Sequence, residues 1–343
     1  MNPPRTVHIA GGGLAGLALG VALRQHGVPT ELHEAGSYPR HRVCGEFVSG
    51  ITPAELETLG IADDFADAAR PRSTVWYDTT RERLRAPLPQ AAWGISRHQL
   101  DARLAHRFVE LGGQLLTRSR VSPATDLTGW VWATGRPRRE STWLGLKAHF
   151  LDLPLNADLE LHLGHRSYIG LTRVEHGRVN ACGLFHRPQS FDASRRSDLL
   201  PQACEEAGLS KLADRLRHAS LDADSLKGVN QFLLGWQPAT NPEELRLGDF
   251  AAMTPPLTGN GMSMALQSAL DALPPLLAWS QHRQDWPTTT AAVRLAQRQR
   301  FGGRLRWARL LQRIVLHPTA SRLSLALLQR RTLPFDRLFA LTR

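Results

Sequence analysis

The feature that most constrains the fold of this chain is a glycine-rich loop near its start. Residues 6–10 predict a buried strand and residues 14–26 predict a helix, and the loop Gly11–Gly16 joins them in a G-x-G-x-x-G pattern. Residues 29–34 predict a second strand. This order of elements is a β-α-β unit, which requires a parallel sheet with a helix packed against it.

The loop also has the chemistry of a dinucleotide site. Glycines lack the Cβ atoms that would keep a pyrophosphate away from the backbone, and a helix start offers unpaired N–H groups. Glu34, eighteen residues after Gly16, lies where an acid accepts hydrogen bonds from an adenosine ribose, which disfavours a 2′-phosphate. The residues expected at the dinucleotide are Gly11, Gly13, Leu14, Ala15, Gly16 and Glu34. This pattern does not distinguish FAD from NAD.

A second glycine-rich segment lies about two hundred residues further along the chain. A strand is predicted at 246–250, and a Pro- and Gly-rich loop leads from it into a helix predicted at 261–277. The segment resembles the flavoprotein superfamily that includes geranylgeranyl reductases, aromatic hydroxylases of the p-hydroxybenzoate hydroxylase type and flavin-dependent halogenases. The resemblance implies that an Asp holds the ribityl chain of FAD and that the helix start faces the flavin pyrimidine ring. The matching residues are Gly248, Asp249, Pro256, Gly259, Asn260, Gly261 and Met262.

Other segments extend this resemblance over most of the chain. Residues 40–49 resemble the R-x-K-x-C-G-E stretch of the reductase and halogenase branches, with Arg42 nearest to the basic position. The resemblance also implies that Arg97 reaches the cofactor and that Val121 meets the adenine through its backbone. The Ala133–Gly135 turn departs from the Asp-Gly form of many aromatic hydroxylases, which counts against that branch.

Cys44 is the candidate catalytic residue, and two interpretations remain open for it. A thiol beside the flavin could donate a proton or position the substrate, since an ordinary thiol is protonated at neutral pH. Alternatively, Cys44 is a small packing residue next to Gly45. The neighbouring Glu46 is interpreted as a structural hydrogen-bonding partner rather than a general acid.

Length and strand spacing predict more than one lobe. At 343 residues the chain exceeds the usual size of one compact core, and residues 143–185 contain four closely spaced predicted strands, as in an antiparallel sheet. The fold class is therefore α/β. We predict a Rossmann-like FAD-binding domain at 1–140 and 228–280, an inserted antiparallel substrate lobe at 141–227, and C-terminal helices at 281–343.

The remaining elements are predicted from capping, periodicity and turn residues. They are a capped helix from Thr52, a hairpin of strands 73–77 and 83–88, a helix at 97–111, strands at 114–117 and 130–133, and helices within 192–218, 289–316 and 321–331. In the substrate lobe His149, His162 and Tyr168 are candidates for the pocket lining, although single histidines on strands are more often structural. No histidine pair has metal-ligand spacing, so no metal site is predicted.

The formal net charge of +11 is confined to the end of the chain. Residues 290–343 hold twelve arginines and one acid, whereas the preceding residues carry equal numbers of bases and acids. We therefore expect no nucleic-acid partner. An apolar stripe among these arginines, from Leu305 to Val315, leaves peripheral membrane contact open. Three cysteines without C-x-x-C spacing, and no leader or membrane-spanning segment, lead us to expect a cytoplasmic protein.

The sequence thus predicts an FAD-dependent oxidoreductase with NAD(P)H as the electron source and a small, hydrophobic substrate. The Cys-Gly-Glu segment and the Ala133–Gly135 turn favour reduction of a carbon-carbon double bond, and flavin-dependent monooxygenation is the alternative. Halogenation is less favoured, because residues 167–171 lack the tryptophans of the halogenase motif. A hypothesis of another class is a non-catalytic nucleotide-binding module with an Arg-rich binding tail.

Overall fold

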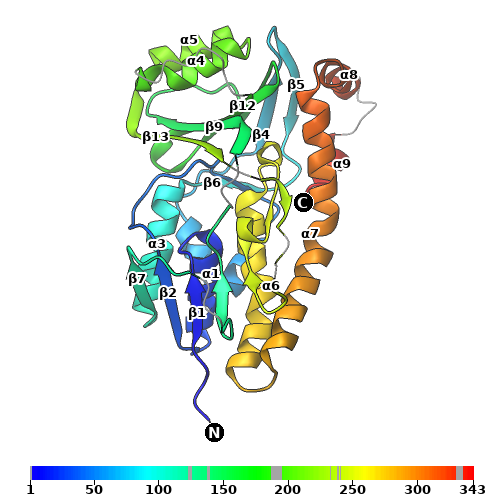
Figure 1. The fold of residues 1–343 in the computed structure, drawn as a ribbon. Coiled ribbons are helices and arrows are strands. Elements are labelled where there is room, and N and C mark those ends of the chain that lie inside the picture. Colours follow the sequence, from blue (N-terminus) through cyan, green and yellow to red (C-terminus); the bar gives the residue numbers. More distant parts are fainter. Residues whose placement is uncertain are drawn as a thin grey trace.

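The computed structural model describes residues 2–122, 126–136, 140–186, 195–231, 233–237, 239, 241–329 and 335–343. Two sheets dominate it, one parallel and near the N-terminus, the other larger and at the opposite end of the molecule (Figure 1). The long helices α6 (Gly261–Ser280) and α7 (Trp286–Leu316) run side by side along the molecule. The α/β fold class predicted from the sequence is confirmed.

The first sheet is parallel throughout and has the strand order β15-β8-β1-β2-β7. Its strands are β1 (Val7–Ala10), β2 (Thr30–Glu34), β7 (Gln114–Thr117), β8 (Trp130–Trp132) and β15 (Leu245–Arg246). Helix α1 (Leu14–Gln25) follows β1, and α3 (Arg97–Glu110) precedes β7. The predicted β-α-β unit is confirmed. The predicted strand at 246–250 is shorter, because Gly248 takes a φ of +57° and residues 248–250 form a single 3₁₀ turn.

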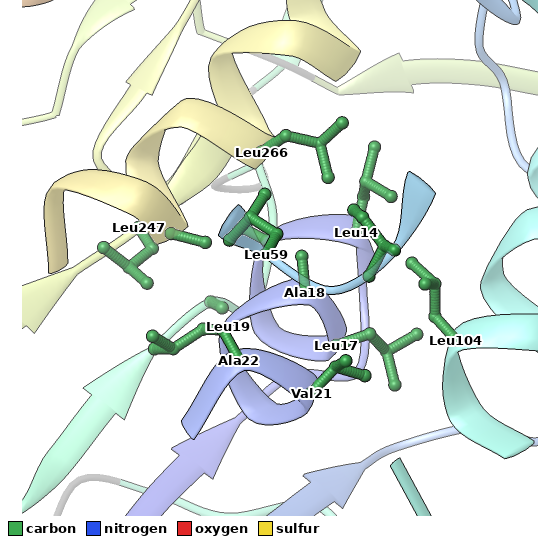
Figure 2. Close-up of a cluster of buried hydrophobic side chains, with 14 of the residues drawn as sticks. Leu14, Leu17, Ala18, Leu19, Val21, Ala22, Leu59, Leu104, Leu247 and Leu266 are labelled. Atoms are coloured by element: carbon green, nitrogen blue, oxygen red, sulfur yellow. The ribbon is translucent and has the colours of Figure 1, made fainter. Parts of the chain in front are cut away.

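Helix α1 is buried on nearly every side, which explains its small and branched apolar residues. Leu17 and Leu19 are fully buried, and their neighbours come from α3, α6 and the loop before the 3₁₀ turn (Figure 2). Burying one such side chain contributes about 1.5–3 kcal/mol. Packing on all sides holds the glycine-rich loop, which starts this helix, in one place relative to α6.

Two short pairs of strands and one short helix lie outside the two large sheets. Strands β3 (Phe47–Ser49) and β6 (Ala92–Gly94) pair antiparallel, as do β14 (Gly235–Trp236) and β16 (Ala252–Met253). Helix α2 (Pro53–Thr58) begins at Thr52, whose hydroxyl accepts from the Glu55 N–H while the Glu55 carboxylate accepts from the Thr52 N–H. This capping box confirms the helix start predicted from the sequence.

The second sheet has the order β13-β9-β12-β11-β10-β4-β5 and is antiparallel except for the β10–β4 pair. Its strands are β4 (Ser73–Tyr77), β5 (Glu82–Pro87), β9 (Glu140–Phe150), β10 (Leu159–Gly164), β11 (Ser167–Arg173), β12 (Val179–His186) and β13 (Leu221–Gln231). The predicted hairpin β4–β5 forms, yet it joins this sheet although the sequence placed residues 73–87 with the cofactor domain. Strand β4 extends the sheet by pairing with β10. This contact is long-range, so the local sequence pattern does not reveal it.

Two helices cover the face of this second sheet that points away from the first, parallel sheet (Figure 1). Helices α4 (Leu199–Glu206) and α5 (Ser210–His218) place Leu200, Leu212 and Leu216 against apolar residues of β9 and β11. The helical prediction for 192–218 is confirmed where the structure describes it, while residues 192–194 lie outside the described residues. The opposite face of the sheet is therefore the one turned toward the first lobe.

A buried ion cluster anchors α5 to this sheet. Glu160 on β10 is fully buried and accepts from His162 Nε2 at 2.9 Å and from Arg215 Nη1 at 2.8 Å. Burial alone raises the pKa of Glu160, but the hydrogen bonds from His162 and Arg215 outweigh it and lower the pKa to about 2.

We predict that Glu160 makes stability depend on acid pH. Its contribution is complete above the ordinary pKa of about 4.5 and is lost as the pH falls toward about 2, because the folded state then has to bind a proton it resists. Between pH 6 and pH 3 this loss amounts to about 2 kcal/mol. Denaturant unfolding at both pH values should show a correspondingly smaller pH dependence for Glu160→Gln. Equal pH dependence in the two proteins would contradict the role of Glu160.

The C-terminal helices pack on the body of the protein. Besides α6 and α7 they are α8 (Pro318–Gln329) and α9 (Phe335–Ala340); the sequence pattern missed α9, and the end of the predicted 321–331 helix lies outside the described residues. The apolar stripe of α7 is divided. Leu305 is buried, Ile314 and Val315 face an internal cavity, and only Trp307 and Leu310 are exposed. Membrane contact through this stripe stays a prediction. Within the described residues, every helix is too short or too polar to cross a bilayer.

Candidate functional site

A cavity of about 1150 Å³ lies between the two sheets and is lined by residues of both lobes and of the C-terminal helices. Its volume exceeds the roughly 300–1,000 Å³ of most single small-molecule sites. The cavity runs from the glycine-rich loop after β1 to the start of α6, which are the two segments singled out in the sequence. Such a space accommodates an extended cofactor together with a substrate.

Most of the residues predicted for the site line this cavity. They are Gly11, Gly13, Leu14, Ala15, Glu34, Arg42, Cys44, Arg97, Val121, Gly248, Asp249, Pro256, Gly259, Gly261 and Met262. Gly16 and Asn260 do not line it. The Ala133–Gly135 turn also lies on the wall. Segments far apart in the sequence are therefore brought together as expected, while the individual contacts to a cofactor stay predictions.

The first loop has the close packing that requires glycine. Gly11 has a φ of +110°, and a Cβ at this position would overlap the carbonyl group of Ala133 on the neighbouring strand end. A Cβ on Gly16 would overlap the carbonyl oxygen of Gly11, so Gly16 lets α1 start directly beneath the loop. A Cβ on Gly13, the residue before α1, would only just contact Arg97 Nη2, at 3.9 Å, and Gly13 carries no side-chain cap, which leaves the helix start free for an anion.

Glu34 is almost fully buried and ties the loop to the end of β2. Its carboxylate accepts from the Gly12 N–H at 3.0 Å and from the Gly36 N–H at 2.7 Å, and it pairs with Arg40 at 2.6 Å. Arg42 is 3.5 Å from the second carboxylate oxygen. A ribose hydroxyl would therefore meet Glu34 beside two guanidinium groups, of which the sequence had singled out only that of Arg42 for the cofactor.

Asp101 of α3 fixes two arginines on the cavity wall. It is fully buried, accepts from Arg97 at 2.7 Å through both carboxylate oxygens, and accepts from Arg42 Nε at 3.1 Å. Burial opposes the charge of Arg97, but Asp101 outweighs it and raises the pKa of Arg97. Arg97 thus remains cationic, and the Asp101 carboxylate holds both guanidinium groups in place beside the cavity.

The second helix start resembles the first. Asn260 precedes α6 and provides no side-chain cap, so the first N–H groups of this twenty-residue helix are unpaired near Gly261 and Met262 on the cavity wall. Gly259 takes a φ of +66°, which turns the chain into the helix. Burial raises the pKa of Asp249 nearby, while the charges of Arg136 and the other cavity arginines oppose this rise.

The shape and charge of the cavity correspond to those of FAD. The cavity offers two uncapped helix starts at separate places, one for a pyrophosphate and one for the electron-rich edge of a flavin ring. Glycines at the first start leave the close approach that a pyrophosphate needs, and Asp249 lies on the wall with them. The residues present therefore fit this cofactor.

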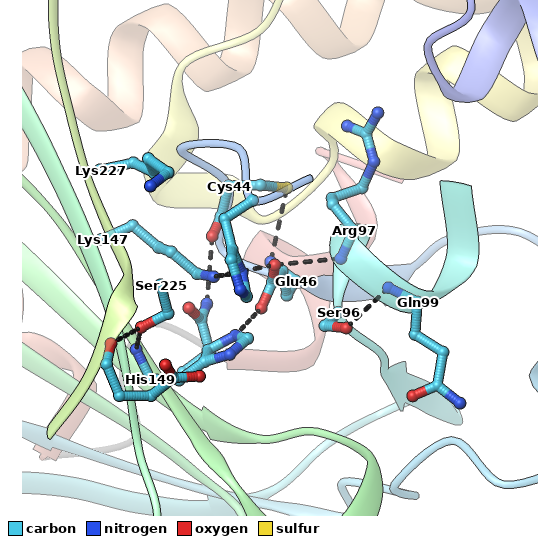
Figure 3. A network of polar contacts seen from close by, with 12 residues as sticks. Cys44, Glu46, Ser96, Arg97, Gln99, Lys147, His149, Ser225 and Lys227 are labelled. Carbon is cyan, nitrogen blue, oxygen red and sulfur yellow. Dashed lines mark hydrogen bonds and ion pairs between the residues drawn. The ribbon is translucent and has the colours of Figure 1, made fainter. Parts of the chain in front are cut away.

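A buried network of charged groups supports the loop that carries Cys44 (Figure 3). Glu46, Lys147 and His149 are all fully buried. The Glu46 carboxylate lies 2.5 Å from His149 Nε2 and 3.3 Å from Lys147 Nζ, and it accepts from the Arg97 N–H at 3.0 Å. Lys147 is also 3.2 Å from Nδ1 of His41, a cavity residue. The network joins the cofactor loop to strand β9 of the second sheet.

The charge states within the network follow from burial and neighbours. Burial alone disfavours the Glu46 carboxylate, but the hydrogen bond from His149 and the charge of Lys147 outweigh it and lower the pKa of Glu46. Burial and then the charge of Lys147 lower the pKa of His41 to about 4. His41 is therefore neutral near pH 7, and its Nδ1 accepts a hydrogen bond from the Lys147 ammonium.

Cys44 lies on the cavity wall, and its sulfur accepts weakly from the Glu46 N–H at 3.5 Å. Burial raises the pKa of the Cys44 thiol, against the opposing charge of Arg97. The thiol is therefore protonated at neutral pH, as a proton donor has to be. Whether Cys44 acts in this way stays a prediction.

The second sheet forms the apolar wall of the cavity. Side chains paired across neighbouring strands point to the same face, and the row Cys182, Gly170, Leu161 and Trp76 crosses the sheet along the cavity. Leucines and Met253 surround this row, and Val315, Phe335 and Leu338 of the C-terminal helices pack against it. The part of the cavity beyond the cofactor segments is therefore suited to a hydrophobic ligand.

Of the three residues that the sequence proposed for the pocket lining, one lines the cavity and two do not. Tyr168 lines the cavity, as proposed. His149 and His162 do not line it, because their side chains are paired with Glu46 and Glu160. Sequence reasoning also missed His41, Lys147 and Asp101; the signal that was available for Lys147 is a charged residue within an otherwise apolar strand.

A parallel sheet with two glycine-rich helix starts, joined to a second sheet across a large cavity, defines a two-lobed dinucleotide-binding fold. Solved structures with this fold cover nearly the whole chain. PqsL of Pseudomonas aeruginosa in complex with 2-aminobenzoylacetate aligns with a TM-score of 0.74 and 14% identity, over 93% of this chain and 98% of PqsL. The flavin-dependent brominase Bmp2, as a triple mutant, aligns with a TM-score of 0.76 and 18% identity, over 98% and 93% of the two chains.

A third structure holds the cofactor itself. Klebsiella pneumoniae HpxO, complexed with FAD and uric acid, aligns with a TM-score of 0.74 and 17% identity, over 98% of this chain and 95% of HpxO. A scan of family models finds no match, and a search of curated proteins finds no similar sequence. The chain therefore has the fold of FAD-dependent monooxygenases and related flavoproteins.

Proposed function

We propose that this protein is an FAD-dependent monooxygenase that acts on a hydrophobic substrate. The observation that carries the proposal is the single cavity that joins two uncapped, glycine-rich helix starts to an apolar wall. Support comes from the structural neighbours, of which PqsL is described as a probable FAD-dependent monooxygenase. These neighbours favour oxygenation over the double-bond reduction that the sequence put first.

Each end of the cofactor has residues of this chain to hold it. The start of α1, with Gly11 and Gly13, would take the pyrophosphate, and Glu34 the adenosine ribose. Asp249 would accept from the ribityl chain, and the start of α6 would face the pyrimidine ring. When bound, FAD accepts hydride from NAD(P)H and supplies the electrons for reaction with oxygen. The remaining steps depend on how the protein orients the substrate and moves protons.

The overall reaction balances with these components. One NAD(P)H, one O₂ and one proton convert the substrate into its hydroxylated product, NAD(P)⁺ and water. The apolar wall around Leu161 and Trp76 would orient the substrate and exclude water, and Tyr168 is the polar group placed within it. The protonated thiol of Cys44 is the nearest candidate in the cofactor loop for holding the proton that the reaction consumes.

The first test is the cofactor and its electron source. We expect the purified protein to be yellow, to release FAD on denaturation, and to be bleached by NADPH or NADH under anaerobic conditions. A preparation that stays colourless after incubation with FAD would refute the flavoenzyme assignment and would favour the non-catalytic binding module.

The second test separates oxygenation from reduction. The reduced protein is mixed with 2-aminobenzoylacetate, the ligand of the PqsL structure, as an aromatic probe, and with ¹⁸O₂ in one arm and no oxygen in the other. Incorporation of ¹⁸O into the probe, or oxygen-dependent reoxidation that the probe accelerates, would support the monooxygenase. Reoxidation by an added conjugated alkene without oxygen would instead support the reductase.

A further inference from the structure

Arg343 is held in the cavity next to the start of α6. Its Nε donates to Ser49 Oγ of β3 at 2.6 Å, and its Nη1 donates to the Asn260 side chain and, at 3.0 Å, to Thr342 Oγ1. The guanidinium carbon lies 3.9 Å from the centre of the Phe339 ring. Ser49, Asn260 and Thr342 are all buried. The side chain is thus fixed by two distant segments, through Ser49 and Asn260, and by its own C-terminal segment.

The partners of Arg343 are all neutral. Among the described residues no carboxylate lies within ion-pair distance of it, and its surroundings lower its pKa to about 9, chiefly through burial and then through the charge of Arg304. The group is therefore a cation at neutral pH. Holding a cation largely away from water without an anion is costly, so a half-buried guanidinium with no carboxylate partner among the described residues points to an anionic or electron-rich partner.

The position of Arg343 indicates what this partner is. Asn260, which it contacts, is the residue that precedes α6, and the unpaired N–H groups of α6 begin one residue later. Gly259, Gly261, Met262 and Arg343 line the same cavity. The guanidinium and the positive helix end are therefore directed at the same part of the cavity, which is the part that would hold the flavin pyrimidine ring.

We infer that Arg343 sets the reduction potential of the flavin, by adding its charge to that of the α6 start and stabilising the negative charge of the reduced pyrimidine ring. The inference rests on the proposed FAD cofactor and holds whether the reduced flavin meets oxygen or a double bond. Two-electron reduction of the ring without full protonation leaves it anionic, and a nearby cation favours that form over the neutral oxidised ring. Arg343 would thereby influence the redox chemistry of a cofactor whose pyrophosphate binds at the Gly11–Gly16 loop.

The test compares flavin potentials in FAD-loaded proteins, measured by equilibration with a redox dye of known potential. Arg343→Met should lower the reduced-to-oxidised ratio at a given potential at least tenfold, which is a shift of about 30 mV for a two-electron couple. Arg343→Lys should retain most of the native ratio. The difference should shrink at low pH, where the reduced ring gains a proton and becomes neutral. Arg337→Met is the matched control, because Arg337 is an exposed arginine on α9 outside the cavity.

The outcomes separate this inference from the proposed function. An unchanged potential in FAD-loaded Arg343→Met would overturn it while leaving the flavoenzyme assignment intact. If Arg343→Met does not retain FAD, Arg343→Gln provides the neutral comparison. Loss of FAD from both neutral variants would also overturn it, because tuning of the reduced ring is not required to hold the oxidised cofactor. A native protein without FAD would refute both.

Discussion

Replacement of Glu46 by Ala is expected to lower the free energy of unfolding by about 3–5 kcal/mol, because it leaves a fully buried Lys147 without its carboxylate. His149 loses its partner at the same time. Glu46 itself has a φ of +53°, a conformation that a non-glycine residue adopts only when surrounding contacts impose it. Here the imposing contacts are those of the Glu46 carboxylate with Lys147, His149 and the Arg97 N–H. Their loss therefore also frees the loop that carries Cys44 and Glu46.

The measurement is denaturant unfolding of the FAD-saturated proteins. Glu57→Ala is the matched control, since Glu57 is an exposed glutamate on α2, and it should change the free energy by less than about 0.5 kcal/mol. The double variant Glu46→Ala/Lys147→Met should regain a large part of the loss, because it removes the unpaired charge. A loss below about 1 kcal/mol for Glu46→Ala, or no recovery in the double variant, would show that the network does not stabilise the loop.

The elements that the sequence predicted are those specified by local rules. The Gly11–Gly16 loop, the capping box at Thr52 and the alternating strands from 143 to 185 each depend on residues close together in the chain, and all of them form. The cofactor segments could likewise be located, because a glycine is required wherever the backbone itself contacts its neighbour. Gly11 is such a position, whereas Gly248 needs glycine for its φ of +57°.

The contacts that the sequence did not reveal join distant segments. Lys147 meets Glu46 across about a hundred residues, and Arg343 meets Ser49 across almost the whole chain. No periodicity or motif carries such a pairing, which depends on how the second sheet and the C-terminal helices dock on the first lobe. For the same reason the sequence predicted the hairpin of strands 73–77 and 83–88 but did not reveal that it joins the second sheet.

These long-range contacts have a common consequence for the cavity. Arg97, Arg42 and Lys147 are paired with carboxylates that hold them in place, whereas Arg343 has only neutral partners. The three paired cations help to shape the site, and their carboxylate partners neutralise their charge. Arg343, which has no carboxylate partner among the described residues, adds positive charge at the start of α6, where it acts on the charge of a bound ligand.

Replacement of Gly11 by Ala is expected to weaken FAD binding by at least about 100-fold, which corresponds to about 2.7 kcal/mol. Two effects act in the same direction. The φ of +110° is outside the range that alanine tolerates, and the new Cβ would overlap the carbonyl of Ala133, which belongs to the backbone and cannot rotate away. The loop would therefore shift toward the cavity and block the approach of a pyrophosphate to the start of α1. Fluorescence titration of the apoprotein with FAD measures the affinity.

Two further glycine variants separate the causes of this effect. Gly302→Ala, in the middle of α7 with no atom within 4 Å of the new Cβ, should leave FAD affinity unchanged and controls for the substitution itself. Gly135 also has a positive φ, +84°, but open space around it, so Gly135→Ala introduces strain without overlap and should weaken binding less than Gly11→Ala. FAD affinity of Gly11→Ala within about threefold of native, a change of less than 1 kcal/mol, would mean that the pyrophosphate does not bind at this loop.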